Sequence, residues 1–150
     1  QQQFDKILSS LEIAQQEGAQ VLTGGKAHQM GGSYFEPTLM VNVPHNAKVA
    51  KEETFGPLAP LFRFSDETDV IRQANDTEFG LAAYFYARDL GRVFRVAEAL
   101  EYGMVGINTG LISTEVAPFG GMKASGLGRE GSKYGIEEYI EIKYLCLGGI

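Results

Sequence analysis

The stretch "LAPLFRFSDETDVIRQANDTEFGLAAYFYARDLGRVFRVAEALEYGMVGINT", residues 58–109, decides the fold. Apolar runs alternate in it with segments of helical period, which gives the order β-α-β-α-β. This alternation predicts parallel strands with right-handed helical crossovers, since strands of the same direction need a long connection. The expected strands are 58–64, 81–87 and 104–109, and the expected helices are 66–76 and 90–102. We therefore expect an α/β fold with a doubly wound parallel sheet.

Both expected helices carry sequence signals at their ends. Asp66 and Asp89 stand at the N-cap positions, where a carboxylate accepts hydrogen bonds from free backbone N–H groups. Gly103 follows the second helix and is expected to cap its C-terminus. Four apolar residues of that helix fall on one stripe and should be buried: Val93, Phe94, Ala97 and Leu100.

The N-terminal part begins with a helical pattern and continues with two strand patterns. Residues 4–18 predict an amphipathic helix that ends at a glycine, a natural left-handed C-cap. Residues 19–23 and 34–43 are expected strands, joined by a glycine-rich loop. Pro37 inside the second strand indicates an edge or a bulge, because proline cannot donate to a sheet. The apolar stripe of the helix contains Phe4, Ile7, Leu8, Leu11 and Ala14.

Composition excludes several classes of protein. The 150 residues are 44% hydrophobic and 21% charged, which is typical of a globular domain with a core. Residues 1–75 hold nine acids and six bases and residues 76–150 ten acids and seven bases, so each half contributes −3 to the net charge of −6. A nucleic-acid partner is disfavoured, since it needs clustered Lys and Arg. Membrane spanning is also disfavoured, because no uncharged apolar run approaches about 18 residues.

Few residues offer a metal site or a reactive thiol. His28 and His45 are both in loop-like sequence and far from the one cysteine, so we expect surface histidines and no metal. Cys146 lies in an apolar terminal segment without a nearby histidine, and we expect it to be buried as a small hydrophobe. A single cysteine excludes an internal disulfide and suits a reducing compartment.

The segment "KEETFGPLAP", residues 51–60, is a candidate ligand contact. Pro57 fixes its own φ and restricts the preceding glycine, so Glu53 and Phe55 are presented from a stiff, non-helical segment before a strand. A carboxylate can accept hydrogen bonds from both hydroxyls of a ribose, and a phenyl ring offers a flat apolar face to a nicotinamide. From the residues alone, a surface glutamate beside a core phenylalanine is the more common explanation.

A second candidate is the loop that follows the strand at 104–109. Asn108, Ser113 and Phe119 arrive at the carboxyl end of this strand, where open α/β sheets bind their ligands. Loops of about twenty residues in compact domains are commonly functional or disordered. A simple turn rich in Ser, Thr and Gly explains the same residues.

The hexapeptide "GLGREG", residues 126–131, has the G-x-G-x-x-G spacing of a dinucleotide pyrophosphate loop. That loop must follow a strand directly and open a helix, and the preceding segment is broken by Pro118, Gly120 and Gly121. We expect a glycine-rich structural turn. A self-contained nucleotide-binding domain would require a strand immediately before Gly126.

Four segments together resemble a known family. "KEETFGP", "ANDTEFGLAAYFYARD", "GMVGIN" and "PFGGMKASGLGREGSKYGIEEYIEIKY", in this order, resemble the C-terminal portion of an NAD(P)-dependent aldehyde dehydrogenase. The match is most specific from Ala47 to about Cys146. Within the family, "NTGLISTEVAPFGGMKASGLGREGSKYGIEEY" resembles the succinate-semialdehyde dehydrogenase branch.

The resemblance implies a specific reaction and cofactor. A cysteine thiolate attacks the aldehyde, hydride passes to NAD or NADP, and a glutamate-activated water hydrolyses the resulting thioester. In this family the nucleophile, the base and the dinucleotide-binding domain precede the segment seen here, so we expect all three to lie outside this chain and the chain alone to be inactive. The lack of an initiator methionine also indicates a longer polypeptide.

The resemblance assigns roles to four residues. Glu53 matches the glutamate that holds the nicotinamide ribose, and Phe55 matches the aromatic residue near the nicotinamide ring. Phe119 matches a wall of the aldehyde tunnel. Ser113 matches the serine that helps bind the distal carboxylate of succinate semialdehyde, beside arginines supplied from upstream.

The resemblance also implies a domain organisation. Residues 1–138 correspond to the C-terminal part of the catalytic domain, and residues 139–150 to the terminal strand of the oligomerisation region, which extends a neighbour's sheet. We expect a homo-oligomer, and we expect Arg129 to pair with Glu141 or with an acid of the partner subunit. Nothing in the sequence directs export, so we expect a cytoplasmic protein, although a targeting peptide could precede Gln1.

One alternative of a different class stays open for these 150 residues. The same α/β fold could serve only as a non-catalytic assembly or small-ligand binding module. Aldehyde oxidation by the full-length protein, and none by this chain alone, distinguishes the two interpretations. The sequence does not discriminate NAD from NADP, because the residues that meet the adenosine ribose lie upstream.

Overall fold

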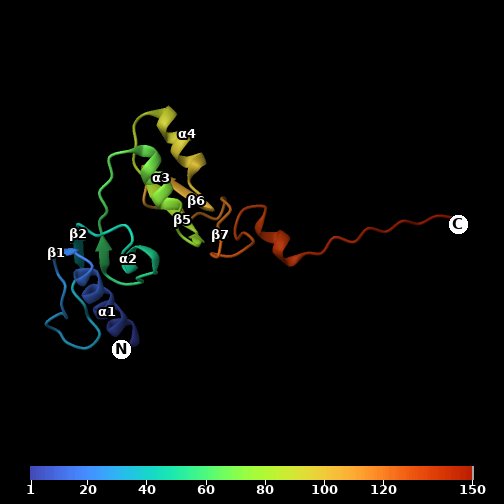
Figure 1. Cartoon of the computed structure of the whole chain (residues 1–150). Helices are drawn as coiled ribbons and strands as arrows, with labels where there is room; N and C mark the ends of the chain where they lie inside the picture. The colour runs from blue at the N-terminus through green and yellow to red at the C-terminus, as the bar shows by residue number, and fades with distance from the viewer. Residues whose placement is uncertain (150) are drawn as a thin grey trace. The chain divides into compact units, whose positions relative to one another are not determined.

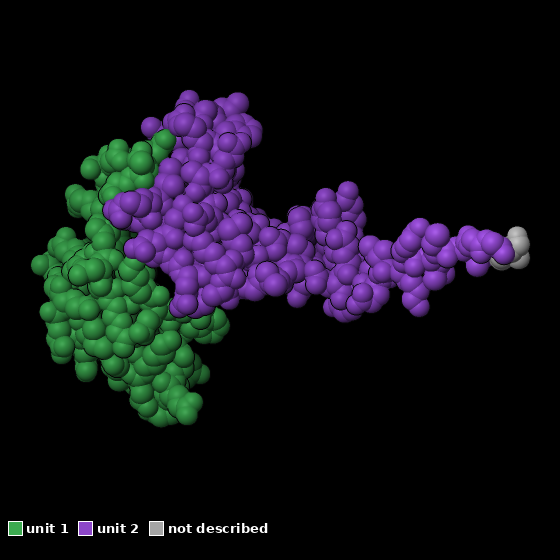
Figure 2. All heavy atoms as spheres, turned by 45° about the vertical axis from the view of Figure 1, so that its right-hand side comes forward, with its two compact units in different colours: residues 1–69 green, residues 70–150 purple. Residues whose placement is uncertain are grey.

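The computed structural model describes residues 1–149, and the chain divides into two compact units, residues 1–69 and residues 70–150 (Figure 2). The expected α/β fold with parallel strands is confirmed, since each unit contains a parallel pair of strands. Antiparallel pairs accompany them, so the three-stranded sheet of the first unit is mixed, while the second unit has one parallel and one antiparallel pair. The boundary between the units falls inside helix α3 (Glu67–Asn75; Figure 1).

The first unit is a three-stranded sheet accompanied by two helices. Its sheet has the order β1-β2-β3, with β1 antiparallel and β3 parallel to the central strand. Pro37 precedes β2 directly, so the expected edge position or bulge at this proline is wrong. The irregularity lies in β1, between Val21 and Thr23. The elements are α1 (Gln2–Gln16), β1 (Gln20–Thr23), β2 (Thr38–Val41), α2 (Lys48–Lys51) and β3 (Leu58–Pro60).

Helix α1 forms as its sequence predicts. Its C-terminus closes with two hydrogen bonds, from Gly18 N–H to the Gln15 carbonyl (3.1 Å) and from Ala19 N–H to the Ala14 carbonyl (2.9 Å). Gly18 has a φ of 109°, as this terminal motif requires. At 15 residues α1 is the longest helix of residues 1–149, and none of these helices is long and apolar enough to cross a membrane.

All buried apolar side chains of the described chain belong to the first unit. They form one cluster in which α1 packs on the sheet, and Met40, on the central strand, is completely buried. Burial of this cluster is the main force that holds α1 in place, because apolar area removed from water stabilises in proportion to its size. The members are Ile7, Leu11, Ala14, Ala19, Met40, Val43, Ala47, Val49 and Leu58.

The second unit contains two short sheets and three helices. Strands β5 and β6 are parallel, with Ala82 opposite Met104 and Phe85 opposite Ile107, while β4 and β7 are antiparallel. Strand β3 pairs with β2 of the first unit, so it does not join β5 as the β-α-β order suggested. The elements are α3 (Glu67–Asn75), β4 (Phe79–Gly80), β5 (Ala82–Phe85), α4 (Leu90–Ala99), β6 (Met104–Ile107), β7 (Met122–Lys123) and the 3₁₀ helix η1 (Gly135–Tyr139).

The ends of α3 and α4 test the signals that the sequence gives for helix caps. The carboxylates of Asp66 and Asp89 accept the N–H groups of Asp69 (2.8 Å) and Arg92 (2.7 Å), which confirms both N-caps. Gly103 is not a cap, because α4 ends at Ala99 and Leu100 follows it in an extended conformation.

The apolar face of α4 is less covered than expected. Phe94 is 58% exposed, and no residue of this helix is buried. The expected buried stripe of Val93, Phe94, Ala97 and Leu100 is therefore wrong for this chain. Within the second unit α4 packs on β6 of a two-stranded sheet, which offers too little apolar area to bury a whole helix face.

The C-terminal tail, residues 140–149, runs extended beyond η1 (Figure 1). It pairs with no strand among residues 1–149, so the expected terminal strand has no partner here. Cys146 is exposed, and its expected burial is wrong because nothing in the described chain covers this segment. A hydrogen bond with the Cys146 side chain raises the pKa of Tyr144 above its ordinary value.

Candidate functional site

Residues 53–55 form a short irregular segment between α2 and β3, which we call the 53–55 segment. Its three consecutive carbonyl groups all accept hydrogen bonds from side chains of α1. Lys6 Nζ donates to the Glu53 carbonyl (2.7 Å), and Gln3 Nε2 donates to the carbonyls of Thr54 (3.0 Å) and Phe55 (2.8 Å). The backbone that presents both candidate side chains is thus fixed to a helix of the core.

The chain directly after the segment is also fixed. The Gly56 carbonyl accepts the N–H of Leu58 (2.8 Å), and the Pro57 carbonyl accepts the N–H of Thr38 on β2 (2.8 Å). Ile7 packs so closely that a Cβ at Gly56 would lie 2.5 Å from its Cδ1 atom. The segment is therefore stiff, as Pro57 predicts, because hydrogen bonds hold the backbone both before and after the proline.

The side chains of the segment are available to a ligand. Glu53 is exposed, and among residues 1–149 no group forms a hydrogen bond or ion pair with its carboxylate. Phe55 is 77% exposed and has a φ of 41°, which is rare for a bulky residue and costs about 1–3 kcal/mol. The alternative of a core phenylalanine is excluded by this exposure. A strained backbone that holds an aromatic ring in solvent indicates a contact surface.

The loop after β6 begins at Asn108, whose side chain is hydrogen-bonded to the backbone of Ala87. The amide of Asn108 donates from Nδ2 to the Ala87 carbonyl (2.8 Å) and accepts the Ala87 N–H at Oδ1 (2.9 Å). These bonds tie together the chain ends that leave the parallel strands β5 and β6. The loop therefore starts from a defined point at the carboxyl edge of this small sheet, as the sequence predicts.

Phe119 and the neighbours of Ser113 meet in the second unit. Phe119 is half-buried and exchanges two backbone hydrogen bonds with Glu130, at 2.8 and 2.7 Å. It lines a cavity of about 190 Å³ together with Ile112 and Thr114, the residues on either side of Ser113. Ser113 itself is exposed. The loop thus places an aromatic wall beside the segment that carries the serine hydroxyl.

The "GLGREG" hexapeptide is a turn, as expected. The strand before it, β7, ends at Lys123, and no helix begins within residues 126–131. The Glu138 carboxyl carbon lies 2.8 Å from the position that a Cβ at Gly128 would take. A carboxylate against this backbone repels a pyrophosphate, so the phosphate-loop alternative loses its physical basis.

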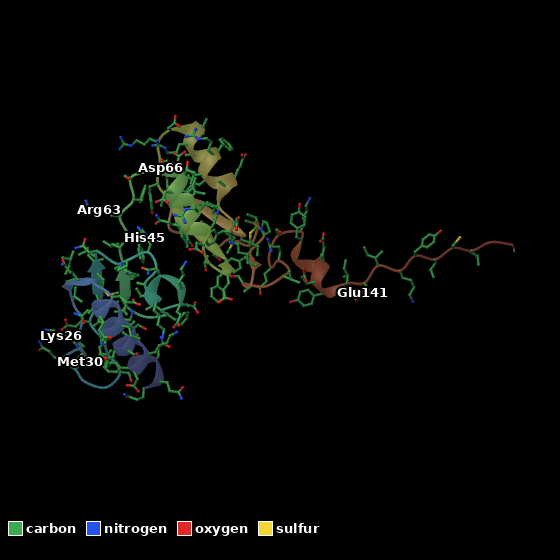
Figure 3. All side chains as sticks on the ribbon, in the orientation of Figure 1. Lys26, Met30, His45, Arg63, Asp66 and Glu141 are labelled. Carbon is green, nitrogen blue, oxygen red and sulfur yellow. The ribbon has the colours of Figure 1, made fainter. Side chains whose placement is uncertain are left out.

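Within residues 1–149 the Arg129 guanidinium is hydrogen-bonded to backbone carbonyl groups. Its Nη1 donates to the carbonyls of Gly121 (2.7 Å) and Gly128 (2.7 Å), and the side chain is partly buried. The expected pair with Glu141 is wrong, because Glu141 lies at the start of the extended tail (Figure 3). The guanidinium instead ties the turn to the chain that follows Phe119.

The histidines and the cysteine form no metal site. His28 and His45 are exposed, and the His45 ring stacks on Phe62 with 5.6 Å between centroids. Throughout residues 1–149 no three His, Cys, Asp or Glu side chains gather to hold an ion. Figure 3 shows His45 in the first unit, whereas Cys146 belongs to the tail of the second.

Sequence reasoning missed Gln3 and Lys6. Both lie on α1, where polar residues on one face ordinarily indicate a solvated surface. Their carbonyl partners are 47 to 52 residues away in the chain, so no local pattern connects them. A left-handed phenylalanine next to Gly56-Pro57 also has no sequence signal.

A model of one protein family matches nearly the whole chain. Residues 1–145 match the model described as "Aldehyde dehydrogenase family". The chain belongs to the aldehyde dehydrogenase family. The family recognised from four sequence segments is thereby confirmed.

Two relatives show how similar this aldehyde dehydrogenase chain is to characterised proteins. It is 75% identical over 143 residues to the NADP(+) succinate-semialdehyde dehydrogenase GabD of Escherichia coli (strain K12), covering 95% of this chain and 30% of that protein. It is 73% identical over 145 residues to a glutarate-semialdehyde dehydrogenase of Pseudomonas aeruginosa, covering 97% of this chain and 30% of the relative.

A solved structure supports the same conclusion for the fold. A crystal structure described as an E. coli NADP dependent enzyme has a TM-score of 0.96 and 73% identity, over 98% of this chain and 31% of that one. The α/β fold is therefore that of part of an aldehyde dehydrogenase. The chain spans about 30% of the length of the relatives that it matches.

Proposed function

We propose that the full-length protein carrying this chain is an NAD(P)-dependent aldehyde dehydrogenase that oxidises succinate semialdehyde to succinate. The 53–55 segment is the observation that carries the proposal: a fixed backbone presents an unpaired carboxylate and a strained, exposed ring. The names of the two relatives support a short aldehyde with a distal carboxylate. This chain supplies walls for the cofactor and the aldehyde and no catalytic residue.

The residues of the segment fit a nicotinamide cofactor. When bound, NAD or NADP supplies a hydride acceptor for aldehyde oxidation. Glu53 would hold it by accepting hydrogen bonds from the hydroxyls of the nicotinamide ribose, since both carboxylate oxygens are free in the described chain. Phe55 would pack its exposed face near the nicotinamide ring and exclude water there.

Ser113 and Phe119 would bind the aldehyde. Phe119 would form an apolar wall, and the exposed Ser113 hydroxyl would donate one hydrogen bond to the distal carboxylate. One hydroxyl is a weak anchor for a charged group, so arginines from elsewhere in the full-length protein would share this role.

Ser113→Ala should weaken substrate binding selectively. Loss of one hydrogen bond of about 1 kcal/mol raises KM for succinate semialdehyde roughly fivefold. Butyraldehyde, which has the same chain length and no carboxylate, is the control, and its KM should not change. Equal effects on both aldehydes in steady-state assays would remove Ser113 from the carboxylate site.

The enzyme assignment is tested with the full-length protein and with this chain alone. Reduction of NADP or NAD at 340 nm should depend on succinate semialdehyde in the full-length protein and be absent from the chain of 150 residues. Turnover by the chain alone would contradict the site assignment. No turnover by the full-length protein with either cofactor would favour the non-catalytic module.

We also propose that the full-length enzyme is a cytoplasmic homo-oligomer. The exposed tail offers a surface for self-association. Ile142 is 95% exposed, and the extended backbone of residues 140–149 leaves its N–H and C=O groups open to a second strand. Residues 139–150 would thus form the terminal strand of an oligomerisation region, and residues 1–138 part of the catalytic domain.

Ile142→Asp should reduce the assembled fraction of the full-length protein in sedimentation velocity. A charge at an apolar strand position opposes its burial against another copy. Lys143→Gln, one residue along the same tail, is the matched control and should leave the sedimentation coefficient unchanged. An unchanged coefficient for both variants would remove the tail from the interface.

A further inference from the structure

The α1 side chains that donate to the 53–55 segment come from a helix that is anchored in the core. Ile7, next to Lys6 in sequence, is buried in the core and also packs against Gly56. Leu11 and Ala14 extend the same buried face of the helix. Gln3 and Lys6 therefore donate from a helix that cannot shift without disturbing the core.

We propose that Gln3 and Lys6 are positioning residues for the nicotinamide cofactor, acting through the backbone of the 53–55 segment. The inference rests on the proposed function, because it concerns the residues that would hold that cofactor. The three hydrogen bonds offset the cost of the left-handed Phe55 backbone and fix where the Glu53 carboxylate points. Without them the segment can relax toward ordinary φ values and carry Glu53 and Phe55 away.

The donors are well suited to this task. A carbonyl group accepts hydrogen bonds, so only a donor can fix its position. The Gln3 amide and the Lys6 ammonium both supply N–H donors, with nitrogen-to-oxygen distances of 2.7 to 3.0 Å. Gln3 contacts two successive carbonyls with one nitrogen, so its loss frees two of the three bonds. Small displacements of a binding group have large effects on ligands that must be aligned for reaction.

Gln3→Met tests the role of the amide at nearly constant size. We expect the Kd of the full-length protein for NADP, measured by isothermal titration calorimetry, to rise about tenfold, with kcat also falling and KM for succinate semialdehyde unchanged. Gln2→Met is the matched control, since the Gln2 side chain is exposed and makes no hydrogen bond within residues 1–149. Lys6→Met should act in the same direction, and Lys6→Arg, which keeps donors, should restore binding.

A double-variant cycle separates positioning from general damage. If Gln3 acts through Glu53 and Phe55, Gln3→Met should raise the Kd by a smaller factor in a Glu53→Gln background than in the wild type. Additive effects, or equal Kd values for Gln3→Met and Gln2→Met, would overturn the proposal. Unchanged thermal unfolding of Gln3→Met excludes loss of the fold as the cause.

A measurement without cofactor distinguishes failure of this inference from failure of the proposed function. Chymotrypsin cleavage after the exposed Phe55, followed by mass spectrometry, reports how firmly the segment is held. Cleavage should be several-fold faster in Gln3→Met than in Gln2→Met. Faster cleavage with unchanged NADP affinity would overturn the positioning role while leaving the enzyme assignment intact. A wild-type protein without NADP or NAD binding and turnover would overturn both.

Discussion

Gly103→Ala is expected to destabilise the full-length protein by roughly 3 kcal/mol or more. Gly103 lies between α4 and β6, where its N–H donates to the Gly80 carbonyl (2.9 Å). A Cβ there would overlap the carbonyl oxygen of Gly120 and lie 2.8 Å from the Cα of Gly121. All of these obstacles are backbone atoms, so no side chain can rotate away, and the two chain segments would have to separate.

The effect should be measured as a fall in the thermal unfolding midpoint and in the denaturant midpoint. Gly110→Ala is the matched control, because Gly110 has an ordinary φ and a Cβ there would meet nothing within 4 Å. We expect that control to stay within about 0.5 kcal/mol of the wild type. If both variants unfolded alike, close backbone contact would not be the reason for glycine at position 103.

Gly103 also shows what the sequence alone does not predict. Gly103 follows a helical pattern, so it was predicted to be a C-cap, whereas its structural role is a close approach to Gly120, 17 residues away in the chain. A glycine carries no information about which distant backbone it meets. Caps at Asp66 and Asp89 were predictable because donor and acceptor are three residues apart.

Burial was predictable only where the covering surface lies within residues 1–149. The stripe of α1 is covered, with Ile7, Leu11 and Ala14 buried and Phe4 and Leu8 half-buried. The stripe of α4 and the apolar tail have the same kind of pattern, yet Phe94 and Cys146 are exposed. A periodic apolar face predicts that something covers it, and the sequence does not say which surface supplies the cover.

For the candidate site too, some features were predictable from the sequence and others were not. Pro57 indicated a stiff segment, and the structure bears this out through the hydrogen bonds on both sides of the proline. The donors Gln3 and Lys6 and the left-handed Phe55 were not predictable, since all depend on how α1 packs against a loop about fifty residues later. The family resemblance, and not the local pattern, indicated ligand roles for Ser113.

Glu53→Gln is expected to lower kcat/KM for the cofactor about 10- to 100-fold in the full-length enzyme. The substitution keeps the size of the side chain and removes its charge and one acceptor oxygen, and hydrogen bonds to charged groups contribute about 1.5–3 kcal/mol. Stability should be unchanged, because Glu53 is exposed and its carboxylate has no partner within residues 1–149.

The neighbouring residue provides the control for this prediction. Glu52→Gln makes the same chemical change one position earlier, on an exposed side chain whose carboxylate lies 3.6 Å from Lys48 Nζ. An exposed pair of this kind contributes little, so kinetics and stability should both stay near wild type. Steady-state kinetics with varied NADP would refute the ribose role if the two variants behaved alike. A loss confined to Glu53→Gln, with KM for the aldehyde unchanged, would show that the carboxylate acts on the cofactor, because general weakening of the segment would impair both ligands.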